Sequence, residues 1–344
     1  MVKIKGSKNG GIVTAHFDGK SKSLYPSLKN TKALVLLSIT GNEFCAGEYL
    51  KAIVEKACLT HEFTTFLIAD EVFWHNLRVD FSSREEEELR KQASELGQAY
   101  FEENLSSFLS PLGISPAQFD EQELKQFPLD KMICLNKLAK EKSNFEVVNW
   151  SSWLNKSKKF LLKQDEIQSF FFTEDTLMDS VEDTASNFAR RHATETSTKD
   201  LLLKRSKGYL IEETPGVIWV AASLGYNFII YPGEMIKPFK KAKDFFVKSQ
   251  SKQNEIESLS IHSKKPELLV NWLEVSFKRT HNTSSKNNNI NHLNNNINKP
   301  TNQIDGDLLA IMKGVTEGIF SQSMGNDEKI ECLSKIILNI SKQT

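Results

Sequence analysis

Three short motifs, far apart in the 344-residue chain, carry side chains that together could transfer an acyl group. The first is Ser38, which follows the apolar run of residues 33–37 and precedes the polar turn 40–42. A serine hydroxyl at the end of a buried strand is placed to act as a nucleophile. The alternative is a small residue that merely fits a strand-to-helix turn. The GxSxG pattern of hydrolases is absent, because Leu36 and Thr40 stand where its glycines would be.

The second motif pairs Tyr209 with Glu213, four residues later. On a helix these side chains share one face about one turn apart. A phenol and a carboxylate could then meet in one cleft, where the carboxylate could act as a general base or hold an ammonium group. The third motif is Tyr231, which closes an apolar strand just before Pro232 and could contact a ligand there. An exposed Tyr-Glu pair and an ordinary edge aromatic are the alternatives.

These residues need elements that bring them together, and the N-terminal part of the chain predicts a βαβ unit. Residues 31–38 form a short apolar run, and residues 44–58 have helical spacing. A second strand spans about 64–69 and ends at Asp70-Glu71. Strand, helix and strand in this order indicate a parallel sheet with helices on its faces. Ligands bind beyond the carboxyl ends of such strands, which is where Ser38 lies.

The rest of the chain is predicted to be mainly helical. Helices are expected over 83–109, 131–142, 164–190 and 197–213, the last ended by Pro215, and a further strand over 226–231. We expect five segments: an N-terminal extension (1–30), a Rossmann-like domain (31–250), a helical extension (251–281), an Asn-rich linker (282–303) and a small helical tail (304–344).

Composition narrows the class of protein. Lys plus Arg and Asp plus Glu both number 44, and the resulting net charge of zero neither requires nor excludes a nucleic-acid partner. The four cysteines are scattered without metal-ligand spacing, which argues against a zinc site or a disulfide framework and favours a reducing compartment. Neither a secretory signal nor a bilayer-spanning stretch is visible. We therefore expect a soluble cytoplasmic protein with no metal and no membrane contact.

The three motifs, in this order and at these distances, resemble the tRNA-dependent cyclodipeptide synthases. The match is to the subgroup in which Pro follows the strand-end Tyr, and it covers about residues 30–245, including the stretch FLIADEVFWHNL. The resemblance implies an α/β fold with a Rossmann-like parallel sheet, similar to the catalytic domain of class I tyrosyl- and tryptophanyl-tRNA synthetases. The HIGH-type and KMSKS-type signatures of those synthetases are absent, and no cofactor is expected.

The resemblance also implies a ping-pong aminoacyl transfer. Ser38 would take the aminoacyl group of one charged tRNA as an ester. The amine of a second aminoacyl-tRNA would attack that ester, and the dipeptidyl intermediate would cyclise to a diketopiperazine. Ester exchange is close to isoenergetic and needs positioning more than a strong base. Tyr209 and Glu213 match the pair that holds the amino group in this family, and Tyr231 would orient the aminoacyl-enzyme.

Two further sets of residues are expected to bind substrate. Alternate strand positions, the turn after Ser38 and the residue after Tyr231 would line the amino-acid pocket: Leu34, Leu36, Leu67, Ala69, Gly41, Asn42 and Pro232. Leu36 departs from the family, which often has Gly there. The tRNA phosphates need cations, and the foremost candidates are Lys237, Lys240, Lys241 and Lys243. Further candidates lie at 156–163 and 204–207, whereas the helix over 84–104 is rich in Glu and is expected to be a solvated acidic face. For the lysines after 236, snorkelling on an amphipathic helix is the alternative.

Two other functions are consistent with these residues. One is a synthetase-like protein that has lost catalysis and only captures tRNA or a small amino-acid derivative. The other is an α/β hydrolase that uses Ser38 and needs a histidine beside it. We expect a monomer whose C-terminal helical tail docks on the main domain, self-associates or binds a partner.

Overall fold

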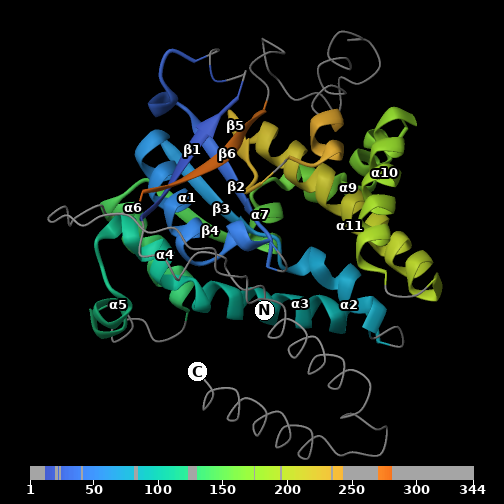
Figure 1. Ribbon diagram of the computed structural model, residues 1–344, viewed down its shortest axis with the longest axis horizontal. Helices are drawn as coiled ribbons and strands as arrows, with labels where there is room; N and C mark the ends of the chain where they lie inside the picture. Colours follow the sequence, from blue (N-terminus) through green and yellow to red (C-terminus); the bar gives the residue numbers. More distant parts are fainter. Residues whose placement is uncertain are drawn as a thin grey trace, which may run out of the picture. The chain divides into compact units, whose positions relative to one another are not determined.

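Figure 1 shows the computed structural model, which describes residues 12–19, 22, 25–39, 42–80, 84–122, 130–173, 175–193, 196–233, 235–242 and 270–280. All of them belong to one compact unit, Met1–Thr283. Gly41, Lys243, and the linker and tail expected after residue 281 lie outside the described residues.

Six strands form one sheet in the order β1-β6-β5-β2-β3-β4 (Figure 1). The strands are β1 (Ile12–Asp18), β2 (Lys32–Leu37), β3 (Phe63–Ile68), β4 (Phe145–Asn149), β5 (Phe228–Ile230) and β6 (Asn271–Thr280). Neighbouring strands are parallel except β1 and β6, which are antiparallel. The long β6 pairs with β5 at its start and with β1 over the rest of its length, so it joins β1 to the parallel part.

The described helices lie in the connections between successive parallel strands, as crossover connections in a parallel sheet require. They are α1 (Gly47–Thr60), α2 (Trp74–Asp80), α3 (Glu86–Glu103), α4 (Leu105–Leu109), α5 (Pro116–Gln122), α6 (Lys131–Lys142), α7 (Trp150–Asn155), α8 (Lys158–Leu162), α9 (Gln164–Phe171), α10 (Asp175–His192) and α11 (Thr196–Ser223). Within the part of the chain that the structure describes, no helix is both long and apolar enough to cross a bilayer.

Helices cover both faces of the sheet, which explains why its central strand is apolar almost throughout. In β2, Ala33, Val35 and Leu37 pack on the side of α1, α4 and α6. Leu34 and Leu36 pack on the side of α7, α9 and α11. A strand buried on both faces needs apolar side chains at successive positions. The α/β class with a parallel sheet, predicted from this run, is confirmed.

The strand order reverses at β2, and this reversal places the predicted site. The chain runs from β2 outward through β3 to β4, and then returns to place β5 on the other side of β2. A crevice opens beyond the carboxyl ends of the strands at such a reversal. Ser38 follows β2 and Tyr231 follows β5, and these strands pair with Val35 opposite Ile230. The topology therefore brings two sequence-distant residues to one edge of the sheet.

Three helices differ from prediction. The one predicted over 164–190 is two helices in the structure, α9 and α10. α11 continues through Pro215, whereas the sequence predicts that the helix ends there. A proline inside a helix costs about 3 kcal/mol, but residues 213–221 are all buried, and their tertiary packing outweighs this cost. The single helix predicted over 83–109 is two helices, α3 and α4, which meet at Asn104.

Three strands are missing from the prediction. The first is β1, which lies in the stretch expected to be an N-terminal extension and pairs with β6. β4 is a short strand that pairs with β3 at the edge of the sheet. Residues 271–280 form β6, although the sequence predicts a helical extension over 251–281. Their sequence, NWLEVSFKRT, largely alternates more and less buried residues, which is the period of a strand with one covered face. The helical expectation is wrong for this stretch because that alternation outweighs any helical spacing.

Candidate active site

A cavity of about 490 Å³ lies at the reversal of strand order, where β2 and β5 end. Its wall includes all four residues predicted to be catalytic: Ser38, Tyr209, Glu213 and Tyr231. Two of them come from strand ends and two from α11. The helix α10 contributes a further part of the wall, including Arg191 and His192, which are both exposed.

Tyr209 and Glu213 lie one turn apart on α11 and both face the cavity, as their spacing predicts. The Tyr209 hydroxyl donates a hydrogen bond to Glu213 Oε1 at 3.2 Å. Burial raises the pKa of Glu213 to about 8, although the hydrogen bond from Tyr209 opposes this shift. The cavity wall therefore carries a protonated carboxyl group near neutral pH. An ammonium group beside it would favour the carboxylate, so the pair is suited to binding an amine and taking a proton from it.

Asn42 ties the turn after β2 to the turn after β5. Its Nδ2 donates to the carbonyl oxygen of Pro232 at 2.6 Å, and its Oδ1 accepts the backbone N–H of Phe44 at 3.0 Å. The Asn42 side chain also hydrogen-bonds to Tyr231. One amide therefore holds the Ser38 turn and Tyr231 in a common arrangement.

The Tyr231 phenol and the Cys45 thiol beside Ser38 are both kept neutral by their surroundings. Burial, and next the nearby Glu213, raise the pKa of Tyr231 well above its ordinary value, so its phenol stays protonated. The Ser38 backbone N–H donates to Cys45 Sγ at 3.4 Å. Burial raises the pKa of the Cys45 thiol to about 12. This cysteine supports the turn and does not supply a thiolate nucleophile.

The residues predicted to line an amino-acid pocket divide into two groups. Leu36 and Ala69 line the cavity. Leu34 and Leu67 are fully buried in the apolar core on the same face of the sheet, and neither is part of the cavity wall. Period-two spacing selects the correct face, but only the positions near the strand ends reach the cavity. Pro232 is buried and contributes its carbonyl oxygen to Asn42.

The described lysines predicted to contact tRNA lie just after the Tyr231 turn. Lys237 is exposed, and its Nζ lies 3.0 Å from Asp183 Oδ2. Lys241 is also exposed, whereas Lys240 is partly buried. None of these three lysines lines the cavity. Arg205, a further candidate, is buried and donates to a backbone carbonyl oxygen of α2 at 3.0 Å. Its contact is structural, which removes it from the candidates for phosphate binding.

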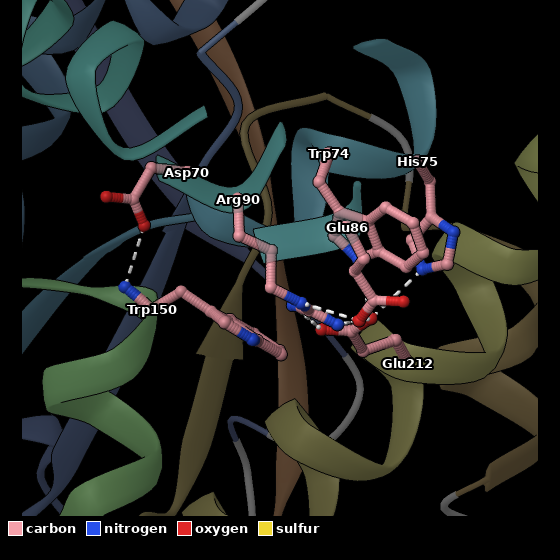
Figure 2. Close-up of polar contacts among 7 residues, drawn as sticks. All are labelled: Asp70, Trp74, His75, Glu86, Arg90, Trp150 and Glu212. Carbon is pink, nitrogen blue, oxygen red and sulfur yellow. Dashed lines mark hydrogen bonds and ion pairs between the residues drawn. The ribbon is translucent and has the colours of Figure 1, made fainter. Parts of the chain in front are cut away.

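Four residues beside the cavity form a polar cluster that the sequence does not predict (Figure 2). Glu212 comes from α11, Arg90 from α3, and Trp74 and His75 from α2. Arg90 holds both oxygens of Glu212, with Nη1 at 2.8 Å from Oε1 and Nη2 at 2.9 Å from Oε2. Trp74 Nε1 donates to Oε2 at 3.0 Å, and His75 Nε2 lies 3.0 Å from the same oxygen. We call these four residues the Glu212 network.

The Glu212 network holds a charged carboxylate. Burial alone would raise the pKa of Glu212, but its hydrogen bonds with His75 and Arg90 outweigh burial and lower the pKa to about 2. The sequence predicts that the helix carrying Arg90 is a solvated acidic face, and at Arg90 this is wrong. Trp74 and His75 belong to the acidic-aromatic stretch singled out in the sequence, but no local pattern there identifies Glu212 as their partner.

Asp70, which follows β3 at the strand end singled out in the sequence, has a structural role. Asp70 is 2% exposed, and its Oδ1 accepts the backbone N–H of Trp150 at 2.8 Å (Figure 2). Burial raises the pKa of Asp70 to about 6, although the hydrogen bond from Trp150 opposes this shift. Asp70 is not part of the cavity wall. Among the described residues, no group of three or more His, Cys, Asp or Glu side chains is arranged to hold a metal ion.

Comparison with known proteins supports the fold. No protein-family model and no curated protein matches the chain. The solved structure of a cyclodipeptide synthase (CDPS) from Fluoribacter dumoffii is similar, with a TM-score of 0.54 at 17% identity, over 79% of this chain and 100% of that chain. The chain therefore shares its fold with that solved structure.

Two further structures have TM-scores below 0.5, so the fold assignment rests on the first. The CDPS from Staphylococcus haemolyticus has a TM-score of 0.42 at 12% identity, over 77% of this chain and 98% of that chain. A cyclodipeptide synthase from Bacillus thermoamylovorans has a TM-score of 0.43 at 13% identity, over 78% and 97%. In this fold, the three sequence motifs meet at one cavity.

Proposed function

We propose that this chain is a tRNA-dependent cyclodipeptide synthase that joins the aminoacyl groups of two aminoacyl-tRNAs, with Ser38 as nucleophile. The observation that carries the proposal is the shared cavity, because Ser38, Tyr209, Glu213 and Tyr231 line one space of about 490 Å³. The similarity of the fold to the Fluoribacter dumoffii CDPS supports it.

In the first step, Ser38 Oγ attacks the ester carbonyl carbon of an aminoacyl-tRNA. A bond forms between Oγ and that carbon, the bond to the ribose oxygen breaks, and the serine proton ends on the departing ribose oxygen. One ester replaces another, so the step depends on alignment more than on a strong base. A cavity that offers a phenol and a carboxyl group beside the serine is compatible with this requirement.

In the second step, Glu213 and Tyr209 hold the amino group of a bound aminoacyl moiety. An arriving ammonium shifts Glu213 to its ionised form and binds it through a charge-assisted hydrogen bond. The amine must become neutral before it attacks, and Glu213 can accept the proton. The neutral amine of the second aminoacyl-tRNA attacks the carbonyl carbon of the Ser38 ester. The C–N bond forms, the bond to Ser38 Oγ breaks, and Oγ takes the proton that the amine loses, which leaves a dipeptidyl-tRNA ester. The free amine of the dipeptidyl group then attacks its own ester carbonyl at the ribose. The ester C–O bond breaks, the diketopiperazine leaves, and Tyr231 can pass a proton to the departing oxygen.

The tRNA itself needs cations outside the cavity. Lys237, Lys240 and Lys241 follow Ile236, which lines the cavity, and this placement supports their role in holding phosphates near its mouth. The exposed Arg191 on the cavity wall adds a further positive charge at the same site.

Expression of the chain in bacteria, followed by mass spectrometry of the medium, tests the proposal. Wild type is compared with Ser38→Ala and with Ser206→Ala, a control at a second serine that lines the cavity. We expect a cyclic dipeptide from wild type and Ser206→Ala, and none from Ser38→Ala. With purified protein and labelled aminoacyl-tRNA, the acyl mass should appear on wild type and not on Ser38→Ala. Product from Ser38→Ala would show that another group is the nucleophile.

A serine hydrolase is the second candidate, because His192 also lines the cavity. Its ring packs against that of Phe188, with 4.4 Å between centroids. A hydrolase would release linear acids, and His192→Ala would abolish that release. If soluble wild type captures aminoacyl-tRNA and turns nothing over, the chain is a binding protein that has lost catalysis.

A further inference from the structure

Apolar packing leaves the rotation of α11 about its axis weakly defined. Residues 213–221 are all buried, so this part of α11 has no single apolar stripe that must face the core. Hydrophobic burial is also non-directional. The proposed chemistry nevertheless requires Tyr209 and Glu213 to face the cavity. A rotation by one residue, roughly 100°, would turn both side chains away.

Glu212 supplies a directional contact on the neighbouring side of α11. Its side chain is 11% exposed, and Arg90 of α3, whose side chain is 29% exposed, chelates both carboxylate oxygens. Trp74 and His75 approach the same carboxylate from α2 (Figure 2). Two helices, α2 and α3, thus hold Glu212, which is the residue before Glu213 on α11. The geometry of these hydrogen bonds depends on how α11 is rotated.

Two close approaches connect this network to the sheet and to α11. A Cβ at Gly208, the residue before Tyr209, would lie 2.7 Å from His75 Nδ1, so α2 packs directly on the backbone of α11. A Cβ at Gly97 of α3 would lie 2.2 Å from the Cβ of Asp70, which follows β3. The helix that carries Arg90 is therefore placed against the end of a strand, and the Glu212 network transmits that placement to α11.

We propose that the Glu212 network is a positioning device, which sets the rotation of α11 that points Tyr209 and Glu213 into the cavity. Its catalytic consequence rests on the proposed function. No member of the network lines the cavity, so each acts through α11 and not on substrate. A largely buried ion pair suits this task, because a wrongly rotated α11 would leave the charge of Glu212 without its partner, Arg90.

Steady-state kinetics with full-length protein test the proposal. Glu212→Gln keeps the shape of the side chain and removes its charge, and Arg90→Lys keeps a charge that cannot form two parallel hydrogen bonds. The matched control is Glu86→Gln, which removes the exposed second partner of Arg90 at 2.9 Å and leaves the contact with Glu212. We expect kcat to fall on the order of tenfold to a hundredfold in Glu212→Gln, less in Arg90→Lys and not in Glu86→Gln, with KM near the wild-type value.

A second readout needs no turnover and separates positioning from simple destabilisation. Carbon-detected NMR follows the titration of the Glu213 carboxyl, assigned by comparison with Glu213→Gln. The other titratable and charged side chains that line the same cavity are Glu43, Arg191, His192, Tyr209 and Tyr231. In wild type and Glu86→Gln we expect a pKa raised to about 8. In folded Glu212→Gln we expect it to move toward the ordinary carboxyl value, because the rotated side chain meets solvent.

The outcomes are distinct. A folded Glu212→Gln with wild-type kcat, or with an unchanged Glu213 titration, would overturn the positioning role. A fall in kcat for Glu86→Gln equal to that for Glu212→Gln would show that Arg90 acts through its exposed contact instead. Absence of cyclic dipeptide from wild type would overturn the proposed function, and the NMR titration would still confirm or refute the control of α11 by the network.

Discussion

Two adjacent glutamates on α11 have opposite ionisation because they point into different surroundings. Glu212 meets three hydrogen-bond donors and has a pKa lowered to about 2. Glu213 is buried beside a phenol and has a pKa raised to about 8. Environments that separate the pKa values of neighbouring carboxyl groups are a common way to divide roles between them. One carboxylate can then serve as a permanent anchor, and the other can exchange a proton near neutral pH.

Replacing Glu213 by Gln should stabilise the protein at pH 8.5 more than at pH 5.0. The folded-state pKa is raised from 4.5 to about 8, so between these values the folded protein keeps a proton that the unfolded chain has lost. Wild-type stability therefore falls as pH rises through this interval, by up to ~1.4 kcal/mol per pH unit. Glutamine removes this dependence.

Urea unfolding at both pH values measures the difference in free energy of unfolding between wild type and Glu213→Gln. The control is Glu87→Gln, an exposed position on α3, for which the difference from wild type should not change with pH. A Glu213→Gln difference that also stays constant would contradict a raised pKa in the folded protein. The same variant should lose cyclic dipeptide formation if Glu213 handles the amine.

At the scale of elements, glycines mark the places where helices approach their neighbours most closely. Gly216 of α11 lies where a Cβ would be 2.8 Å from the Trp150 ring, and its carbonyl oxygen accepts a hydrogen bond from Trp153 Nε1 at 3.0 Å. This contact follows directly after Pro215, so the part of α11 that contains the proline is held by α7. Gly97 likewise allows the backbone of α3 to lie directly against the side chain of Asp70.

Gly97→Ala should destabilise the protein although alanine is the better helix former. The new Cβ would lie 2.2 Å from Asp70 Cβ, so α3 has to move away from the end of β3. Overpacking of this kind costs about 1–3 kcal/mol, against a helix-propensity gain of about 1 kcal/mol. Thermal unfolding measures the net effect. Ala99→Gly, on the exposed side of α3, measures the propensity term alone. A Gly97→Ala protein more stable than wild type would contradict the close contact.

At the scale of the whole molecule, β6 joins elements from opposite ends of the described chain. It pairs in parallel with β5 through Asn271 to Leu273 and antiparallel with β1 over the rest of its length. The strand that carries Tyr231 at its end is therefore not an edge strand, because β6 covers it. The proposed site depends on a segment that contributes no side chain to the cavity wall.

Two truncations should behave differently. A chain that ends at residue 283 keeps all six strands and every residue of the cavity wall, so we expect it to fold and to form the same product as full-length protein. A chain that ends at residue 269 loses β6 and exposes the edge of β5, and we expect it to be insoluble or unfolded. Expression, circular dichroism and product analysis compare the two. Loss of product from a folded chain ending at 283 would show that the tail takes part in the reaction.

Local patterns were sufficient for the elements and residues whose signal lies within a few neighbouring positions. The buried run before Ser38 indicates a parallel strand, and the four-residue spacing of Tyr209 and Glu213 indicates one helix face. The cavity that joins these residues to Tyr231 agrees with strand ends meeting at a reversal of strand order. Such signals are readable because side-chain periodicity follows directly from backbone geometry.

Tertiary structure was needed for everything that depends on a partner distant in the chain. Nothing near Glu212 identifies Arg90 as its counterpart, and nothing near Pro215 shows that buried packing carries α11 through it. Leu34 and Leu36 share one face of β2, yet only Leu36 reaches the cavity. Ion pairing, burial and cavity lining are properties of groups brought together by the fold, so their energies, and the pKa values of 212 and 213 that follow from them, are set only when the whole chain has packed.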